Sequence, residues 1–164
     1  MDKAERAGYR SAIKIDDLRE EPEHRPAVAD RLWHAWWKPY GHALSDVEAA
    51  LGEVLAAQGF PFTLIATRDG RFLGTVTGIQ SDIHQRPNLG PCLAALWVEP
   101  EARGQGMAQL LMAAVLERLY AHGFDQVYLS AKPHLCGFYQ SRGWSQIESD
   151  VGDDRLGVFV RALP

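Results

Sequence analysis

Cysteine is scarce in this chain of 164 residues, which has only Cys92 and Cys136. Two thiols without the hydrophobic region of a signal peptide suit a reducing compartment and no disulfide framework, so we expect a cytoplasmic location. No apolar run reaches the length of a membrane-spanning helix, and we therefore expect no membrane partner. The formal net charge of −4 and the lack of a basic stripe argue against nucleic acid as a partner.

The sequence does contain enough apolar residues for one substantial core. Hydrophobic residues make up 46% of the chain, and its length suits a single domain, 1–164, with a core at about 9–160. No internal repeat, low-complexity tract or linker divides it. The alternation of strand-like and helix-like segments indicates an α/β protein.

Hydrophobic periodicity and turn residues predict the order of elements. Strands are expected at 9–15, 62–67, 72–79, 93–98, 126–130, 144–148 and 156–160, and helices at 26–40, from 45 until Gly59, at 104–122 and at 135–142. Ser45 and Glu48 form a capping-box pattern at the start of the second helix. The helix 104–122 is apolar almost all round between Leu110 and Leu116, so we expect it to be largely buried.

A glycine-rich turn, Arg103-Gly104-Gln105-Gly106-Met107-Ala108, is the most informative segment. It follows an apolar strand and opens a helix, so several backbone N–H groups are left unpaired and point the same way. Together with the helix dipole they form an anion site. Because Gly104 and Gly106 have no Cβ, a bulky anion such as a pyrophosphate can approach the main chain.

Three interpretations of this turn compete. A nucleotide P-loop needs lysine and a hydroxyl residue after the last glycine, and the chain has Met107 and Ala108 there. A dinucleotide fingerprint needs glycine at position 109, where Gln109 stands. The third interpretation is a plain strand–helix turn, in which glycine only allows a tight bend. The six residues alone leave this interpretation open.

The wider context resembles the GCN5-related N-acetyltransferase (GNAT) superfamily. The likeness rests on three segments: Leu96-Trp97-Val98-Glu99-Pro100-Glu101, Arg103 with Gly106 and Ala108, and Gly137-Phe138-Tyr139-Gln140-Ser141-Arg142-Gly143-Trp144. The order of the elements also matches. The resemblance implies a mixed, mostly antiparallel sheet flanked by helices and splayed between its fourth and fifth strands.

The resemblance further implies acetyl-CoA, or another acyl-CoA, as the donor, with no metal. The pyrophosphate would rest on the loop Arg103, Gly104, Gln105, Gly106, Met107 and Ala108, and the pantetheine arm would run beside Leu96, Trp97 and Val98. Lys132 stands where relatives often carry an asparagine that contacts the pantetheine, so this contact is in doubt. Relatives are often dimers, which leaves a homodimer open.

The implied reaction is acetyl transfer to a primary amine by direct attack in a ternary complex. Tyr139 matches the family's tyrosine near the coenzyme sulfur, and its phenol is a candidate general acid. Packing of its ring on the core is the alternative. Cys136 invites an acyl-cysteine route, but no histidine–acid support is evident for it. A catalytically silent acyl-CoA-binding or regulatory module is the competing function.

The general base is less defined. The strand 93–98 contains no acid, and we expect Glu99 and Glu101 beyond it to be solvated. Asp82 and His84 are base candidates in the connection 80–91. At pH 7 a lysine amine is neutral only about one time in 2,500. An α-amine with a pKa near 8 is neutral far more often, because its deprotonation costs only about 1–1.4 kcal/mol. A site without an evident strong base fits an α-amine or a water-relayed proton path, which tilts the acceptor toward a low-pKa small amine or a peptide N-terminus.

Two residues are candidates for acceptor binding. Arg86 lies in a connection that resembles a GNAT subgroup, which includes the animal enzyme that acetylates acidic actin N-termini, so Arg86 is a candidate to hold an acidic acceptor. Trp37 belongs to a cluster with Trp33, Trp36 and Tyr40 that is a candidate acceptor wall. Core packing of the cluster and solvation of Arg86 are the competing interpretations.

Overall fold

The computed structural model describes residues 12–164 of the chain, and one sheet of seven strands runs through them. The strands follow the spatial order β1-β2-β3-β4-β5-β7-β6. They are β1 (Lys14–Asp17), β2 (Phe62–Arg68), β3 (Arg71–Ile79), β4 (Cys92–Val98), β5 (Gln126–Ala131), β6 (Ser145–Val151) and β7 (Leu156–Ala162). All neighbours pair antiparallel apart from the parallel pair β4 and β5, which confirms the expected mixed, mostly antiparallel sheet.

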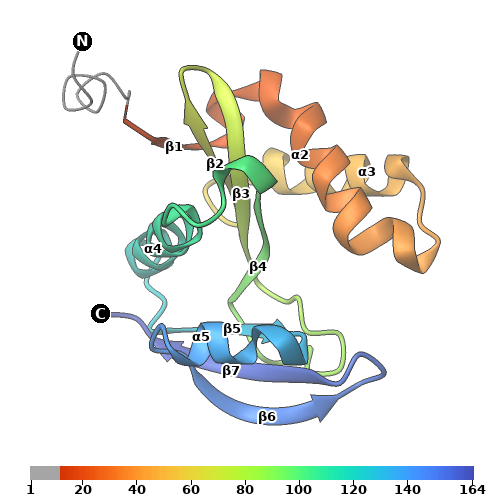
Figure 1. The fold of residues 1–164 in the computed structure, drawn as a ribbon, viewed down its shortest axis with the longest axis vertical. Coiled ribbons are helices and arrows are strands. Elements are labelled where there is room, and N and C mark those ends of the chain that lie inside the picture. The colour runs from red at the N-terminus through yellow and green to blue at the C-terminus, as the bar shows by residue number, and fades with distance from the viewer. Residues whose placement is uncertain (1–11) are drawn as a thin grey trace.

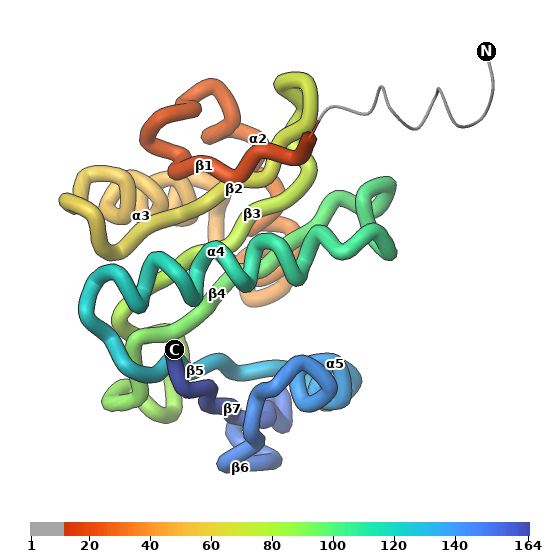
Figure 2. Tube along the Cα trace, turned by 90° about the vertical axis from the view of Figure 1, so that its left-hand side faces the viewer, coloured from red at the N-terminus to blue at the C-terminus, as the bar shows by residue number. Residues whose placement is uncertain are grey.

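Helices flank this sheet, as expected. The α-helices are α2 (Arg25–Leu32), α3 (Leu44–Ala56), α4 (Met107–Ala121) and α5 (Cys136–Gln140). Single helical turns are η1 (Leu18–Glu20), η2 (Pro22–His24), η3 (Trp33–Trp37), η4 (Lys38–Tyr40), η5 (Pro100–Ala102) and η6 (Pro133–Leu135). Figure 1 shows α4 on one side of β2, β3 and β4, and α2 with α3 on the other. In Figure 2, β5, β6, β7 and α5 form the part of the molecule below α4.

The alternation of side chains along β2 explains why apolar clusters form on both faces. Phe62 and Leu64 belong to the main cluster, together with Leu111 of α4. Ile65, which points to the opposite face, packs instead in the cluster that contains Leu51 of α3. The first four strands are therefore held between two helical layers.

Strands β4 and β5 separate almost as soon as they meet. Within the described chain their register holds one residue pair, Cys92 with Tyr128, whereas β5 and β7 share six. A bulge in β4 accompanies the separation: Thr77 pairs with Ala94 and Thr75 with Trp97, so that two residues of β4 face one of β3. The expected splay between the fourth and fifth strands is confirmed.

Several predicted boundaries shift. The first strand was expected at 9–15; residues 9–11 lie outside the described residues, and β1 runs two residues further, to Asp17. The predicted helix 26–40 becomes α2 followed by the π-type turn η3 and the 3-10 turn η4. These tighter and wider turns rotate the aromatic residues away from a uniform helical face.

Two details of the helix predictions were wrong. The capping pair Ser45 and Glu48 does not form, because α3 begins one residue earlier and the Ala43 N–H donates to the Asp46 carboxylate at 2.9 Å. Helix α4 is not buried all round, since Leu110 is 46% exposed. A carboxylate three residues into a helix reaches its N-cap backbone without help from serine.

Arg19 connects β1, α3 and β2 at one point. Its guanidinium donates to the Val54, Leu55 and Pro61 carbonyls at 2.6, 3.1 and 2.6 Å, and it pairs with Asp17 at 2.8 Å. Two of these carbonyls belong to the last turn of α3, where backbone donors are scarce; the Val54 carbonyl also accepts from the Ala57 N–H at 3.3 Å. One side chain thus caps a helix and fixes the loop that follows it.

We predict that Arg19→Met lowers the free energy of unfolding by about 3 kcal/mol, because charge-assisted hydrogen bonds to backbone carbonyls are lost at once. Urea denaturation measures the change. Arg71→Met is the matched control, since its guanidinium is 70% exposed and pairs with the exposed Glu101; we expect a loss below about 1 kcal/mol there. Equal losses in the two variants would contradict the role of Arg19.

Candidate functional site

The glycine-rich turn presents an open backbone at the start of α4. Gly104 and Gly106 have φ angles of 73° and 79°, and a Cβ built on either would meet no atom within 4 Å. The first helical hydrogen bond joins the Leu110 N–H to the Gly106 carbonyl at 3.2 Å. The N–H groups of Met107, Ala108 and Gln109 therefore precede the helical ladder and face outward at the positive end of the helix dipole.

Two arginines frame this turn. Arg103 donates from Nε to the Val98 carbonyl at 2.9 Å, and its guanidinium lies 4.9 Å from the centre of the Trp97 ring. Arg142 stacks on Phe138 at 3.7 Å and donates to the Phe138 carbonyl at 3.0 Å. Sequence reasoning missed Arg142; its place four residues after Phe138 within the predicted helix 135–142 was the available signal.

A groove of about 580 Å³ runs along the turn; we call it the loop groove. It is lined by Leu96, Trp97, Val98, Arg103, Gly104, Gly106, Met107, Ala108, Gln109, Leu135, Phe138, Tyr139 and Arg142. Eight of these thirteen residues belong to the end of β4 and the turn, where the sequence predicted the donor site. Gln105 lies apart, because its side chain donates back to the Glu101 carbonyl at 3.2 Å.

A second cavity of about 640 Å³ lies on the other side of the splayed strands; we call it the aromatic cavity. It is lined by Ala35, Trp36, Trp37, Tyr40, Asp82, Leu93, Ala94, Ala95, Leu96, Trp97, Leu129, Ser130, Ala131, Lys132, His134, Leu135, Tyr139, Asp154 and Leu156. Leu96, Trp97, Leu135 and Tyr139 line both cavities. The two spaces therefore meet across β4.

The structure shifts the pKa values of Tyr139, which lies at the junction, and of Asp82, which lines the aromatic cavity. Tyr139 is only 9% exposed, and burial raises the pKa of its phenol. Asp82 lines the aromatic cavity and is exposed, yet the surrounding protein partly desolvates its carboxylate and raises its pKa to about 6. One group holds its proton and the other releases it near neutral pH.

Other predicted residues lie elsewhere. His84 is exposed in the same connection as Asp82 but lines neither cavity. Arg86 is engaged by Glu148, with Nη2 to Oε1 at 2.7 Å and Nε to Oε2 at 2.9 Å. Cys136 borders a separate hollow beside Arg155. The structure thus brings Asp82, Lys132, Trp37 and Tyr139 together and leaves these three outside.

The aromatic cluster is shared between core and cavity. Trp37 packs against the apolar cluster of α2 and α3, as the core interpretation expects, and it also lines the aromatic cavity. Tyr40 reaches across the cavity and donates to the Asp154 carboxylate at 2.5 Å. Asp154 is not among the site residues predicted from the sequence, because its partner lies 114 positions away.

Glu99 corrects an expectation. It was expected to be solvated, but it is 6% exposed and its carboxylate accepts from Arg31 Nε at 2.7 Å. This ion pair ties α2 to the end of β4, directly before the glycine-rich turn. Glu101 is half exposed and pairs with Arg71 at 2.8 Å, in line with the expected surface position.

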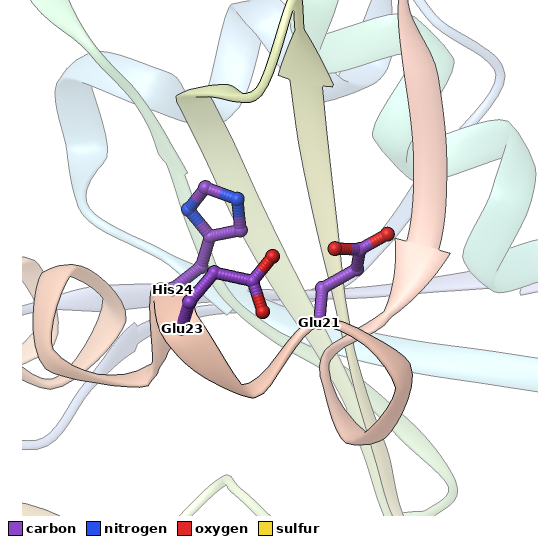
Figure 3. Close-up of side chains that lie close together, drawn as sticks. All are labelled: Glu21, Glu23 and His24. Atoms are coloured by element: carbon purple, nitrogen blue, oxygen red, sulfur yellow. The ribbon is translucent and has the colours of Figure 1, made fainter.

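One side-chain group of the described residues has the spacing of metal ligands. The potential ligand atoms of Glu21, Glu23 and His24 lie within 4.8 Å of one another (Figure 3). Glu21 precedes η2, and Glu23 and His24 belong to it. Lys14 Nζ already lies 3.3 Å from the Glu21 carboxylate. None of the three residues lines the loop groove or the aromatic cavity.

The helices of residues 12–164 include none whose length and apolar character would suit the crossing of a bilayer.

Comparison with known proteins places the chain in a family. Residues 38–159 match the acetyltransferase (GNAT) domain, so the chain belongs to the GNAT acetyltransferase family. It is also 38% identical over 55 residues to an uncharacterized N-acetyltransferase ycf52-like of Prochlorococcus marinus. That match spans 32% of this chain and 31% of the relative, so the chain spans about a third of the length of the curated relative it matches.

Solved structures share the fold at low sequence identity. An aminoglycoside 6'-N-acetyltransferase complexed with coenzyme A superposes with a TM-score of 0.73 and 16% identity, covering 92% of this chain and 97% of that one. An acetyltransferase from Streptococcus agalactiae gives 0.69 and 16%, over 92% and 98%. The acetyltransferase Ard1 from Thermoplasma volcanium gives 0.69 and 16%, over 93% and 99%.

Proposed function

We propose that this protein transfers an acetyl group from acetyl-CoA to a primary amine, by direct attack within a ternary complex. The observation that carries the proposal is the meeting of the loop groove and the aromatic cavity at Tyr139. One space has the shape and the N–H donors for a phosphate-bearing donor, and the other is open to an acceptor. An acyl group held at the junction is accessible from both.

The residues of the loop groove fit the donor. The N–H groups that begin α4 suit the pyrophosphate, and the missing Cβ atoms of Gly104 and Gly106 leave them accessible. Arg103 adds positive charge at the rim. The bulged residues Ala95 and Leu96 lie where β4 has parted from β5, so their backbone groups are free to pair with a pantetheine arm.

Acetyl-CoA supplies an activated thioester, and the chain supplies the proton transfers. The amine nitrogen forms a bond to the acetyl carbon while the bond from that carbon to sulfur breaks. Asp82, ionised above its pKa of about 6, takes the proton from nitrogen directly or through water. Tyr139, whose burial keeps the phenol protonated, gives a proton to the leaving sulfur. A small molecule and a peptide N-terminus both qualify as carriers of the amine.

A substitution in the turn tests donor binding. Gly106→Glu places a carboxylate where pyrophosphate is proposed to lie, so the dissociation constant for coenzyme A should rise by about a hundredfold. Calorimetry measures it. Gly106→Ala is the control, because it carries the same backbone strain at positive φ, about 1–2 kcal/mol, without added charge. Similar coenzyme A affinity in the two variants would remove the turn from the donor site.

The phenol of Tyr139 is tested by Tyr139→Phe. This change keeps the buried ring and removes the proton donor, so kcat should fall by about a hundredfold while coenzyme A binding changes little. Tyr120→Phe serves as the control, since Tyr120 is 54% exposed on α4 and lines neither cavity. A kcat for Tyr139→Phe equal to that of the wild type would leave Tyr139 with a packing role only.

The pH dependence tests Asp82. A protonated carboxylic acid cannot accept the amine proton, so kcat/KM should decrease as the pH falls through about 6. Asp82→Asn should lower kcat/KM at pH 8 by about a hundredfold and remove that limb of the profile. The acceptor amine titrates equally in both enzymes and cancels in the ratio. His84→Gln is the neighbouring control; loss of the limb there, and not in Asp82→Asn, would make His84 the base.

A further inference from the structure

The aromatic cavity has an inner end and an open end. At the inner end, Tyr139 is 9% exposed where the cavity joins the loop groove. At the open end, Tyr40 is 58% exposed and donates its hydroxyl hydrogen to exposed Asp154 at 2.5 Å. Figure 1 shows the two segments that meet here, η3–η4 and the β6–β7 turn, on the same side of β4. An acceptor that reacts at Tyr139 therefore extends toward Tyr40 and Asp154.

The charged side chains of this cavity favour a cation. Asp82 and Asp154 contribute two carboxylates, while Lys132 contributes one ammonium and His134 an imidazole. Arg86, the residue considered for an acidic acceptor, does not line the cavity; its Nε and Nη2 donate to the Glu148 carboxylate and its Nη1 to the Gln85 carbonyl. The charge balance is thus opposite to the one that an acidic acceptor would need.

The rings near the open end add to this preference. Trp36, which is 37% exposed, and Tyr40 line the same space, with Trp37 between them in the sequence. The faces of tryptophan and tyrosine rings carry negative electrostatic potential and attract ammonium groups. The Asp154 carboxylate and the rings of Trp36 and Tyr40 at one end of the cavity form a site for a positive charge.

We propose that the acceptor carries a second positive charge, which binds between Asp154 and the rings of Trp36 and Tyr40 while the reacting amine lies beside Tyr139 and Asp82. The acceptor is then a small amine of the diamine type, with the two nitrogens at opposite ends of an aliphatic spacer. This inference rests on the proposed function, because it assigns the reacting end by the junction with the loop groove.

Three amines of matched length test the inference: 1,6-diaminohexane, hexylamine and 6-aminohexanoate, which differ only in the distal group. With acetyl-CoA as donor, kcat/KM should be about tenfold higher for the diamine than for hexylamine, and lowest for the aminohexanoate. Equal values for the three amines, or preference for the carboxylate, would overturn the second-charge site while leaving acetyl transfer intact.

Variants at the open end locate the site. Asp154→Asn should reduce the ratio of kcat/KM between diamine and hexylamine toward one, and Asp154→Lys should reverse the preference in favour of 6-aminohexanoate. Asp153→Asn is the matched control, because Asp153 is an exposed neighbour that does not line the cavity. An unchanged ratio in both Asp154 variants would place the distal charge elsewhere and contradict the proposal.

Binding provides a second readout that does not need turnover. Quenching of tryptophan fluorescence by 1,6-diaminohexane and by hexylamine is measured with and without coenzyme A. We expect tighter binding of the diamine in both conditions, and loss of this difference in Asp154→Asn. If coenzyme A fails to bind, the proposed function fails, and the amine titrations still decide the present inference. If coenzyme A binds and the two amines bind equally, only the inference fails.

Discussion

Two neighbouring parallel strands that part after one residue pair create the space on which the rest of the site depends. A continuous ladder between β4 and β5 would use the backbone groups of β4 and close the gap between the two halves of the sheet. The bulge at Ala95 and Leu96 turns β4 away instead and leaves its end free. The loop groove and the aromatic cavity are the two sides of this opening, and Tyr139 stands between them.

Three sets of contacts fix the two halves of the sheet in position. Tyr139 and Trp144 from the α5 region belong to the main apolar cluster, which joins the lower half to α4. The Arg31–Glu99 ion pair fixes α2 against the end of β4, close to the turn. The Tyr40–Asp154 hydrogen bond links the halves at the outer end of the aromatic cavity. Rigid elements thus surround a gap that is not itself filled by side chains.

Desolvation shifts the pKa values of Asp82 and Tyr139 in the same direction, with different chemical results. Desolvation disfavours the charged form of any acid, so it raises the pKa values of both Asp82 and Tyr139. For the carboxylate the result is a base that titrates near pH 6. For the phenol the result is a group that stays protonated at neutral pH.

Local sequence determined the strands, most helices and the glycine-rich turn, because alternation, glycine and helix-start signals act over a few residues. The sequence did not predict the boundaries of η3 and η4 or the N-cap of α3. Competing local hydrogen bonds decide these features within one helical turn. Contacts between distant residues were decided only by the tertiary structure. Arg86 pairs with Glu148, Glu99 with Arg31, and Asp154 with Tyr40, and the partners lie 62, 68 and 114 positions apart in the sequence. Hydrophobic periodicity does not predict such pairings, because they depend on how the sheet twists and where its strands separate.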